Sequence, residues 1–187
     1  MKLFHTSELH SKPFNDLTIG HCFYDTTARA WTIVFALANS EDKGQKFLVP
    51  LSGANSLVAT PWRPDAGNCG VKRVLTFDLK GSFGIRLDSE PMENQGAHSA
   101  SKPLLVLKNG PAIYSQVMRN PSVPVQRDGF LLNLDSFHCE FANEFREMDI
   151  SDATVIEHWS LVLNAAPNLG KVFFQQSSTQ HTREVAA

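Results

Sequence analysis

VKRVLTFDLKGSFGIRL, at residues 71–87, is the most strictly alternating stretch of the chain. Seven of its nine odd-numbered positions are apolar, whereas Val74 is the only apolar residue among its eight even-numbered positions. A period of two is that of a β-strand with one buried face. The side chains expected on the buried face are Val71, Leu75, Phe77, Leu79, Phe83, Ile85 and Leu87.

A hairpin is the favoured interpretation of this stretch, because a single strand of that length would exceed the usual range. A three-residue turn centred on Gly81 keeps the apolar faces together. It would pair Leu79 with Phe83, Phe77 with Ile85, and Leu75 with Leu87. One long strand bent at Gly81 is the alternative.

Alternating segments separated by turn residues recur along most of the chain, as in an antiparallel β architecture. Further hairpins are expected from residues 21–25 with 30–38, from 103–107 with 112–118, and from 155–163 with 172–174, and residues 46–51 read as a strand. The expected fold class is mainly β, an antiparallel β-sandwich or a partly open barrel, and a jelly-roll-like variant fits equally well. Its parts are an irregular N-terminal arm (1–20), a single β-rich domain (21–176) and a disordered polar tail (177–187).

Residues 129–139 are largely apolar on both faces and read as one central strand. Directly after them, Phe141, Phe145 and Met148 follow at i, i+4 and i+7, the spacing of one helical face. This spacing predicts one short amphipathic helix over residues 140–148.

Composition places the chain among intracellular globular proteins. It has 187 residues, of which 42% are hydrophobic and 19% charged, and it contains no apolar run of the roughly 18 residues that a membrane span needs. The first residues lack the apolar core of a secretory signal. The three cysteines, Cys22, Cys69 and Cys139, form no CxxC pair, which favours free thiols in a reducing, cytoplasmic compartment.

Charge is distributed unevenly. The formal net charge is −2, but residues 135–157 carry seven carboxylates against Arg146 alone, a local charge of −6 that leaves +4 on the remainder. This acidic span is either a solvated surface or a docking surface for a partner with a basic surface, such as a second copy of the chain. Nucleic acid is disfavoured as the main partner, because the chain lacks bulk positive charge.

Few residue combinations suggest catalysis or metal binding. The dipeptides His21-Cys22 and His138-Cys139 lie in expected strands, where neighbouring side chains point to opposite faces. A zinc site would need Cys22 with Cys139 and a third ligand from Cys69 or His158, without the usual ligand spacings. Buried cysteines that pack as small hydrophobes are the favoured interpretation. Neither a metal nor a cofactor is expected.

Two catalytic alternatives use residues of the correct types. Cys139, His158 and Asp152 could form a nucleophilic set, and Glu140, Glu144 and Glu147 could supply paired carboxylates. The first lacks any protease signature, and the second has the spacing of an ordinary surface helix. No phosphate-binding loop, GxGxxG or HExxH motif is present.

The loop at residues 60–70 is the segment most typical of a contact site. Trp62 and Arg63 are residue types enriched at interface hot spots, and they lie between Pro61 and Pro64. The alternative is that Trp62 caps the core. The expected interaction residues are Trp62, Arg63, Glu140, Glu144 and Glu147.

The sequence thus favours a non-enzymatic structural or interaction protein that self-associates or docks a partner. A β-rich domain with an N-terminal arm and a polar tail is similar in layout to viral shell or matrix-type proteins. The alternatives are a β module that binds a small molecule, a lipid or a peptide, and, third, a Cys/His hydrolase.

Overall fold

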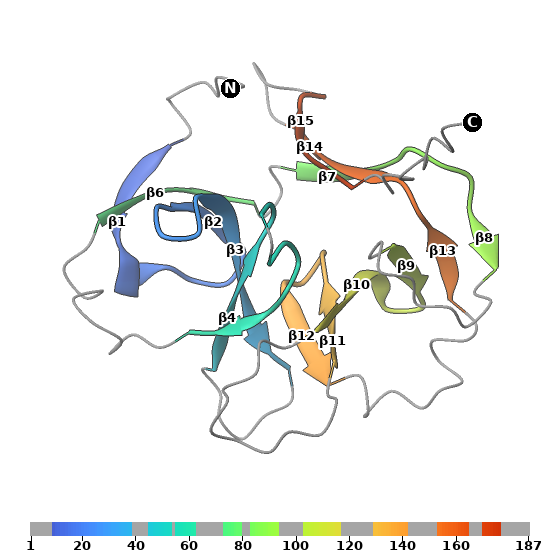
Figure 1. Ribbon diagram of the computed structural model, residues 1–187, viewed down its shortest axis with the longest axis horizontal. Coiled ribbons are helices and arrows are strands. Elements are labelled where there is room, and N and C mark those ends of the chain that lie inside the picture. Colours follow the sequence, from blue (N-terminus) through green and yellow to red (C-terminus); the bar gives the residue numbers. More distant parts are fainter. Residues whose placement is uncertain are drawn as a thin grey trace, which may run out of the picture.

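The computed structural model describes residues 9–38, 45–53, 55–62, 73–79, 83–93, 103–116, 129–141, 153–164 and 170–176. These residues form a mainly β structure with two sheets (Figure 1). Within them, no helix is long and apolar enough to cross a membrane.

Twelve of the strands that the described residues form make up the large sheet. They are β1 (His10–Pro13), β2 (His21–Asp25), β3 (Ala30–Leu37), β4 (Lys46–Pro50), β5 (Thr60–Pro61), β6 (Arg73–Asp78), β8 (Met92–Glu93), β9 (Leu104–Leu107), β10 (Gly110–Gln116), β11 (Gly129–Asn133), β12 (His138–Phe141) and β13 (Thr154–Ile156). The main path runs β1-β6-β2-β3-β12-β11-β10-β9-β13-β8, while β4 pairs with β3 and β5. All these pairs are antiparallel except β12 with β3, which is parallel.

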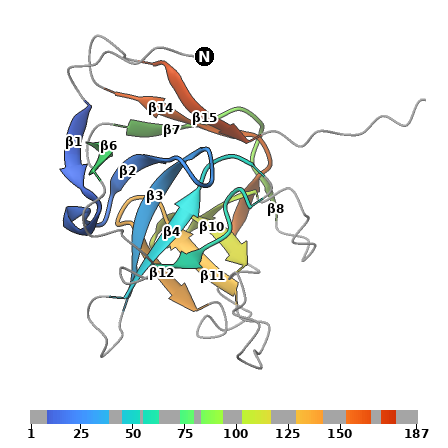
Figure 2. The same cartoon turned by 60° about the vertical axis from the view of Figure 1, so that its left-hand side comes forward.

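The small sheet has the order β15-β14-β7 and is antiparallel. Its strands are β7 (Phe83–Leu87), β14 (Trp159–Leu163) and β15 (Val172–Gln176). Figure 2 shows the small sheet lying across one end of the large sheet. A central core of apolar side chains joins the two sheets, with Ile33 and Phe35 from β3, Ile113 from β10, and Trp159 and Leu161 from β14.

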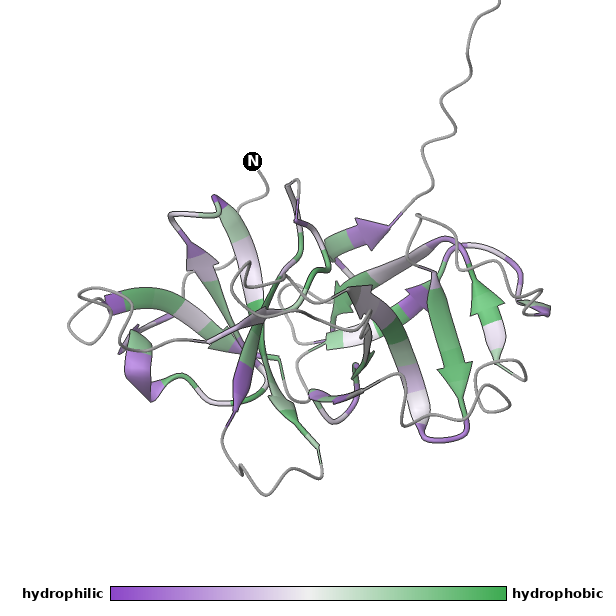
Figure 3. Ribbon diagram, turned by 60° about the horizontal axis from the view of Figure 1, so that its bottom comes forward, coloured by the Kyte–Doolittle hydropathy of each residue, from purple (hydrophilic) through white to green (hydrophobic). Residues whose placement is uncertain are grey.

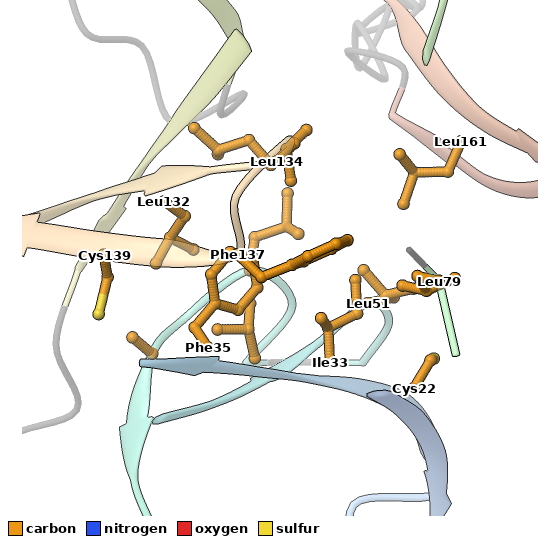
Figure 4. Close-up of a cluster of buried hydrophobic side chains, with 14 of the residues drawn as sticks. Cys22, Ile33, Phe35, Leu51, Leu79, Leu132, Leu134, Phe137, Cys139 and Leu161 are labelled. Atoms are coloured by element: carbon orange, nitrogen blue, oxygen red, sulfur yellow. The ribbon is translucent and has the colours of Figure 1, made fainter. Parts of the chain in front are cut away.

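Aromatic rings make several of the contacts between the sheets. Trp31 of β3 and Phe77 of β6 each pack edge-on against Phe173 of β15, with ring centroids 5.8 and 5.2 Å apart. Phe137, which precedes β12, packs against Phe35 at 5.8 Å and against Phe83 of β7 at 5.6 Å. Figure 4 shows Phe137, Leu134 and Phe35 in the same interior as Leu161 from the small sheet.

A second, smaller core lies on the other face of the large sheet, where the chain before β2 covers Phe23, Val34 and Val74. Phe14 lies in the 3₁₀ helix η2 (Phe14–Asp16) and packs against Phe23 at 5.4 Å. Figure 3 shows hydrophobic residues along much of the strands, with hydrophilic residues at several turns and strand ends. Since β3 has a core on both faces, its sequence is almost continuously apolar.

Two of the expected hairpins are confirmed, β2 with β3 and β9 with β10, each of which joins neighbouring segments through a short turn, so local sequence signals suffice. The hairpin expected from residues 155–163 with 172–174 is confirmed only in part: β14 pairs with β15, but residues 154–156 form β13, which pairs with β9 in the large sheet. The strand expected at residues 46–51 is β4.

The hairpin expected at Gly81 is wrong. β6 pairs with β1 and β2 in the large sheet, whereas β7 pairs with β14 in the small sheet. Alternation shows which face of a strand is apolar but does not show which strand it pairs with. Gly81 itself lies outside the described residues.

Burial along β6 and β7 also differs from the expectation. Phe77 and Leu79 are buried, but Leu75 is 55% exposed and Leu87 is 50% exposed. Val74 and Thr76 are buried instead. Val74 belongs to the smaller core, and the Thr76 hydroxyl donates to the carbonyl oxygen of Cys22 at 2.9 Å. The second face of β6 is therefore also buried, whereas the alternation in the sequence predicted only one buried face.

Three further expectations need correction. Residues 10–16 of the expected irregular arm form β1 and η2, because β1 pairs with β6 and Phe14 is buried. The single strand at 129–139 is two strands joined by a turn at residues 134–137, where Asn133 Oδ1 accepts from the backbone N–H groups of Asp135 and Ser136. The helix expected at 140–148 does not begin at Glu140, because Glu140 lies in β12 opposite Leu131. Residues 142–150 lie outside the described residues, as does the expected tail at 177–187.

Candidate functional site

Trp62 packs inward onto the smaller core. Its ring lies 4.9 Å from that of Phe14, and the Lys46 ammonium lies over it at 4.4 Å from the ring centroid. The Trp62 backbone N–H donates to the Lys46 carbonyl oxygen at 2.8 Å. Lys46 Nζ also donates to the Leu17 carbonyl oxygen at 2.7 Å, and burial lowers the pKa of Lys46. Trp62 is thus a half-buried side chain packed against the smaller core, while Arg63 lies outside the described residues.

The acidic span is distributed over separate turns and strands where it is described. Asp135 lies in the β11–β12 turn, Glu140 in β12, and Glu157 in the β13–β14 turn. None of these three carboxylates forms an ion pair with another described residue. Of the three expected glutamates, Glu140 is described, whereas Glu144 and Glu147 lie outside the described residues.

The cysteines of the two His-Cys dipeptides lie in the central core. Cys22 and Cys139 are both fully buried free thiols. The His21 side chain lies on the opposite face of β2 from Cys22, and its Nδ1 accepts a hydrogen bond from the Thr18 backbone N–H at 2.7 Å. In the described part of the chain, no group of three His, Cys, Asp or Glu side chains is placed to hold a metal ion.

Cys139 has the properties of a packing residue. Its thiol donates to the Ala36 carbonyl oxygen at 3.3 Å, and burial raises its pKa to about 12. A cysteine nucleophile reacts as the thiolate, which this environment disfavours. Of its proposed partners, His158 lies in the β13–β14 turn and Asp152 lies outside the described residues.

A polar cluster that the sequence did not predict connects β7 to β14. The Asp88 carboxylate accepts from Arg86 Nε at 2.6 Å and from the Ser160 hydroxyl. The hydrogen bond from Arg86 lowers the pKa of Asp88, with smaller contributions from Ser160 and from the charge of His158. Ser160 is fully buried and bonds directly to the carboxylate, so the cluster is a structural cross-link.

A pocket of about 500 Å³ opens between the two sheets. One wall is β7, with Phe83, Gly84 and Ile85; the other is the β11–β12 turn, with Leu134, Asp135 and Phe137. This volume lies within the range of small-ligand and side-chain pockets. Pro111 of β10 completes the lining.

Among the described residues that line the pocket, Asp135 is the single charged one. It lies beside Gly110, because a Cβ atom added there would come within 3.0 Å of Asp135 Oδ2. The remaining side chains in the lining are apolar, and two are aromatic. An apolar pocket with one carboxylate fits a ligand that joins an apolar stem to a positive charge.

Sequence reasoning missed this pocket because its walls come from strands that are distant in the sequence. One local signal was available: Asn133, Asp135 and Ser136 are typical turn residues. They would have divided residues 129–139 into two strands and placed Asp135 at an exposed turn.

The small sheet presents an unpaired edge beside this pocket. Among the described strands, β7 pairs with β14 alone, so its other edge has no strand partner.

Comparison with protein-family models, with curated proteins and with solved structures finds no match to this chain.

Proposed function

We propose that this chain is a non-enzymatic interaction protein that associates with another protein chain through the free edge of β7. The observation that carries the proposal is the position of β7, an edge strand whose inner face borders an open pocket. An unpaired edge offers backbone donors and acceptors to an added strand. In this proposal the two sheets form a partly open sandwich, and the opening lies at β7.

Two further observations support association. Leu87, at the end of β7, is an apolar side chain that is 50% exposed. The described carboxylates of the acidic span, Asp135, Glu140 and Glu157, have no compensating ion pair among the described residues, so they are available to a basic partner. The partner is either a second copy of this chain or a different protein. If copies of the chain associate repeatedly, the chain would act as a shell subunit.

The buried Cys139 thiol supports a non-enzymatic role, because burial disfavours the thiolate that the proposed hydrolase would need. The pocket also favours a second candidate, a module that binds a small ligand, since its volume and apolar lining suit one.

Sedimentation velocity over a wide concentration range tests the proposal, together with photo-cross-linking from position 87. We expect association, to itself or to a cross-linked partner, that Leu87→Lys weakens, because lysine disfavours pairing at an edge strand. Leu75→Lys is the matched control: Leu75 is 55% exposed, but β6 is paired on both sides by β1 and β2. A monomer at all concentrations, with no more cross-linking from position 87 than from position 75, would refute the proposal.

A further inference from the structure

We infer that the pocket between β7 and the β11–β12 turn receives a lysine or arginine side chain from an extended partner segment that adds to the β7 edge. This inference rests on the proposed association and specifies its anchor. It follows from three features of the site: the direction of the β7 side chains, the lining of the pocket and the position of Asp135.

The direction of the β7 side chains determines where a partner's side chain would go. Phe83 and Ile85 pack against the central core, so they point toward the large sheet. In a paired strand, residues opposite each other point to the same side. A residue opposite Phe83 or Ile85 on an added strand would therefore point into the pocket, toward Leu134 and Phe137.

The lining of the pocket selects the chemistry of that side chain. Phe83, Ile85 and Phe137 offer apolar and aromatic contact to a hydrocarbon stem, and Phe83 and Phe137 contact each other at 5.6 Å. Asp135 supplies a carboxylate. Lysine and arginine combine an aliphatic stem with a terminal cation, so each can fill the apolar part and still pair with Asp135.

Asp135 is available for this pairing. It is exposed and forms no ion pair with a described residue. The turn orients it, since its backbone N–H donates to Asn133 Oδ1 at 2.9 Å and Asn133 Nδ2 donates to the Asn109 carbonyl oxygen at 2.9 Å. These bonds connect the β11–β12 turn to the β9–β10 turn and hold the backbone of Asp135 at the pocket.

The test uses a blocked peptide, Thr-Val-Lys-Val-Thr, titrated into the isotope-labelled chain and followed by NMR. We expect shifts of the backbone amides of residues 83–87 and 134–137. Asp135→Asn should weaken binding about tenfold, the effect of losing a charged hydrogen bond, while Glu93→Gln should leave it unchanged. Glu93 is a suitable control because it is an exposed carboxylate on β8 that does not line the pocket.

A second peptide carries norleucine in place of lysine, which keeps the stem and removes the ammonium. We expect it to bind about tenfold more weakly than the lysine peptide and to be insensitive to Asp135→Asn. Equal binding of the two peptides, or no effect of Asp135→Asn on the lysine peptide, would overturn the inference. If n-butylamine bound as tightly as the lysine peptide, strand addition would be excluded and the site would be a small-amine pocket.

The peptide experiment and the association experiment can fail separately. Peptide binding is measured on the single chain, so a protein that stays monomeric and cross-links to nothing would refute the proposed function without affecting the peptide result. If the peptide does not bind but association still depends on Leu87, the inference about the basic side chain in the pocket is refuted. The proposed association through the β7 edge then still stands.

Discussion

Phe83 of β7 and Phe137 of the β11–β12 turn meet across the two sheets with their ring centroids 5.6 Å apart. The first belongs to the small sheet, and the second precedes a strand of the large sheet. Their contact fixes the pocket wall against the core, so the stability of the fold and the shape of the candidate site depend on the same pair.

Replacing Phe137 with alanine should destabilise the protein strongly. Phe137 is 1% exposed and packs against both Phe35 and Phe83, so the change should cost about 3–5 kcal/mol. Urea unfolding measures the loss, and Leu75→Ala, at a 55% exposed position, should change stability by less than about 1 kcal/mol. Similar losses in the two variants would mean that Phe137 is not a core residue.

Strand pairing gives a direct prediction by NMR. Backbone contacts should connect Ile85 with Leu161, and side-chain contacts should connect Phe77 with Phe173. A hairpin at Gly81 would instead bring Phe77 opposite Ile85. Nuclear Overhauser effects between the backbones of Phe77 and Ile85 would show that the two strands pair directly and that the assignment to separate sheets is incorrect.

Local signals in the sequence predict where the strands lie better than they predict which strands pair with each other. The β2–β3 hairpin follows from alternation and a four-residue turn that ends at Arg29, which has a φ of 51°. The partner of β7 does not follow from such signals, since β14 lies far along the chain and offers the same kind of apolar face as β6. Thr76 illustrates a second limit, because a polar residue is buried once its hydroxyl bonds to a neighbouring strand.

The candidate site was predictable only in part. The excess negative charge that includes Asp135 is visible in the sequence, and it suggests a basic partner. The pocket is not visible, because it forms only when β7 and the β11–β12 turn come together. Trp62 is a residue type that is common at interface hot spots, and in the structure it is half-buried, with contacts to Phe14 and Lys46 that its sequence position did not predict.

Alkaline pH should destabilise the fold through Cys139. Burial raises the pKa of this thiol from 9.0 to about 12, so between these values the unfolded chain releases a proton that the folded chain retains. Stability due to the protonated thiol is complete below pH 9 and falls by about 1.4 kcal/mol per pH unit above it. Urea unfolding from pH 8 upward should show a shallower decline for Cys139→Ala than for the parent. Identical slopes would mean that the thiol is exposed to solvent.

Acidic pH should act through Asp88. Its pKa lies below the ordinary value of 3.8, chiefly because Arg86 donates to the carboxylate. The stability that the ionised group contributes is present above pH 3.8 and is lost as the pH falls through the lowered pKa. In a carboxyl NMR titration, Arg86→Gln should move the midpoint of Asp88 upward. Arg73→Gln, which removes an arginine bonded to Ser11, should not move it; equal midpoints in all three proteins would contradict the assigned hydrogen bond.

Gly110 should tolerate alanine less well than Gly170. Both have a positive φ, 110° and 76°, but an added Cβ at Gly110 would also come within 3.0 Å of Asp135 Oδ2, whereas at Gly170 it would meet nothing within 4 Å. We expect a loss of roughly 1 kcal/mol at Gly170 and a larger loss at Gly110. Thermal unfolding of the two variants compares them, and a smaller loss at Gly110 would show that Asp135 does not lie over this glycine.

Hydrogen exchange at β7 tests most directly whether this strand is a free docking edge. In dilute protein, the amides of residues 83–87 that point away from β14 should exchange quickly, while the amides that bond to β14 exchange slowly. Association, or addition of the lysine peptide, should slow the fast set. Equal protection of both sets in dilute protein would mean that another part of the chain already covers the edge, which would contradict the proposed docking.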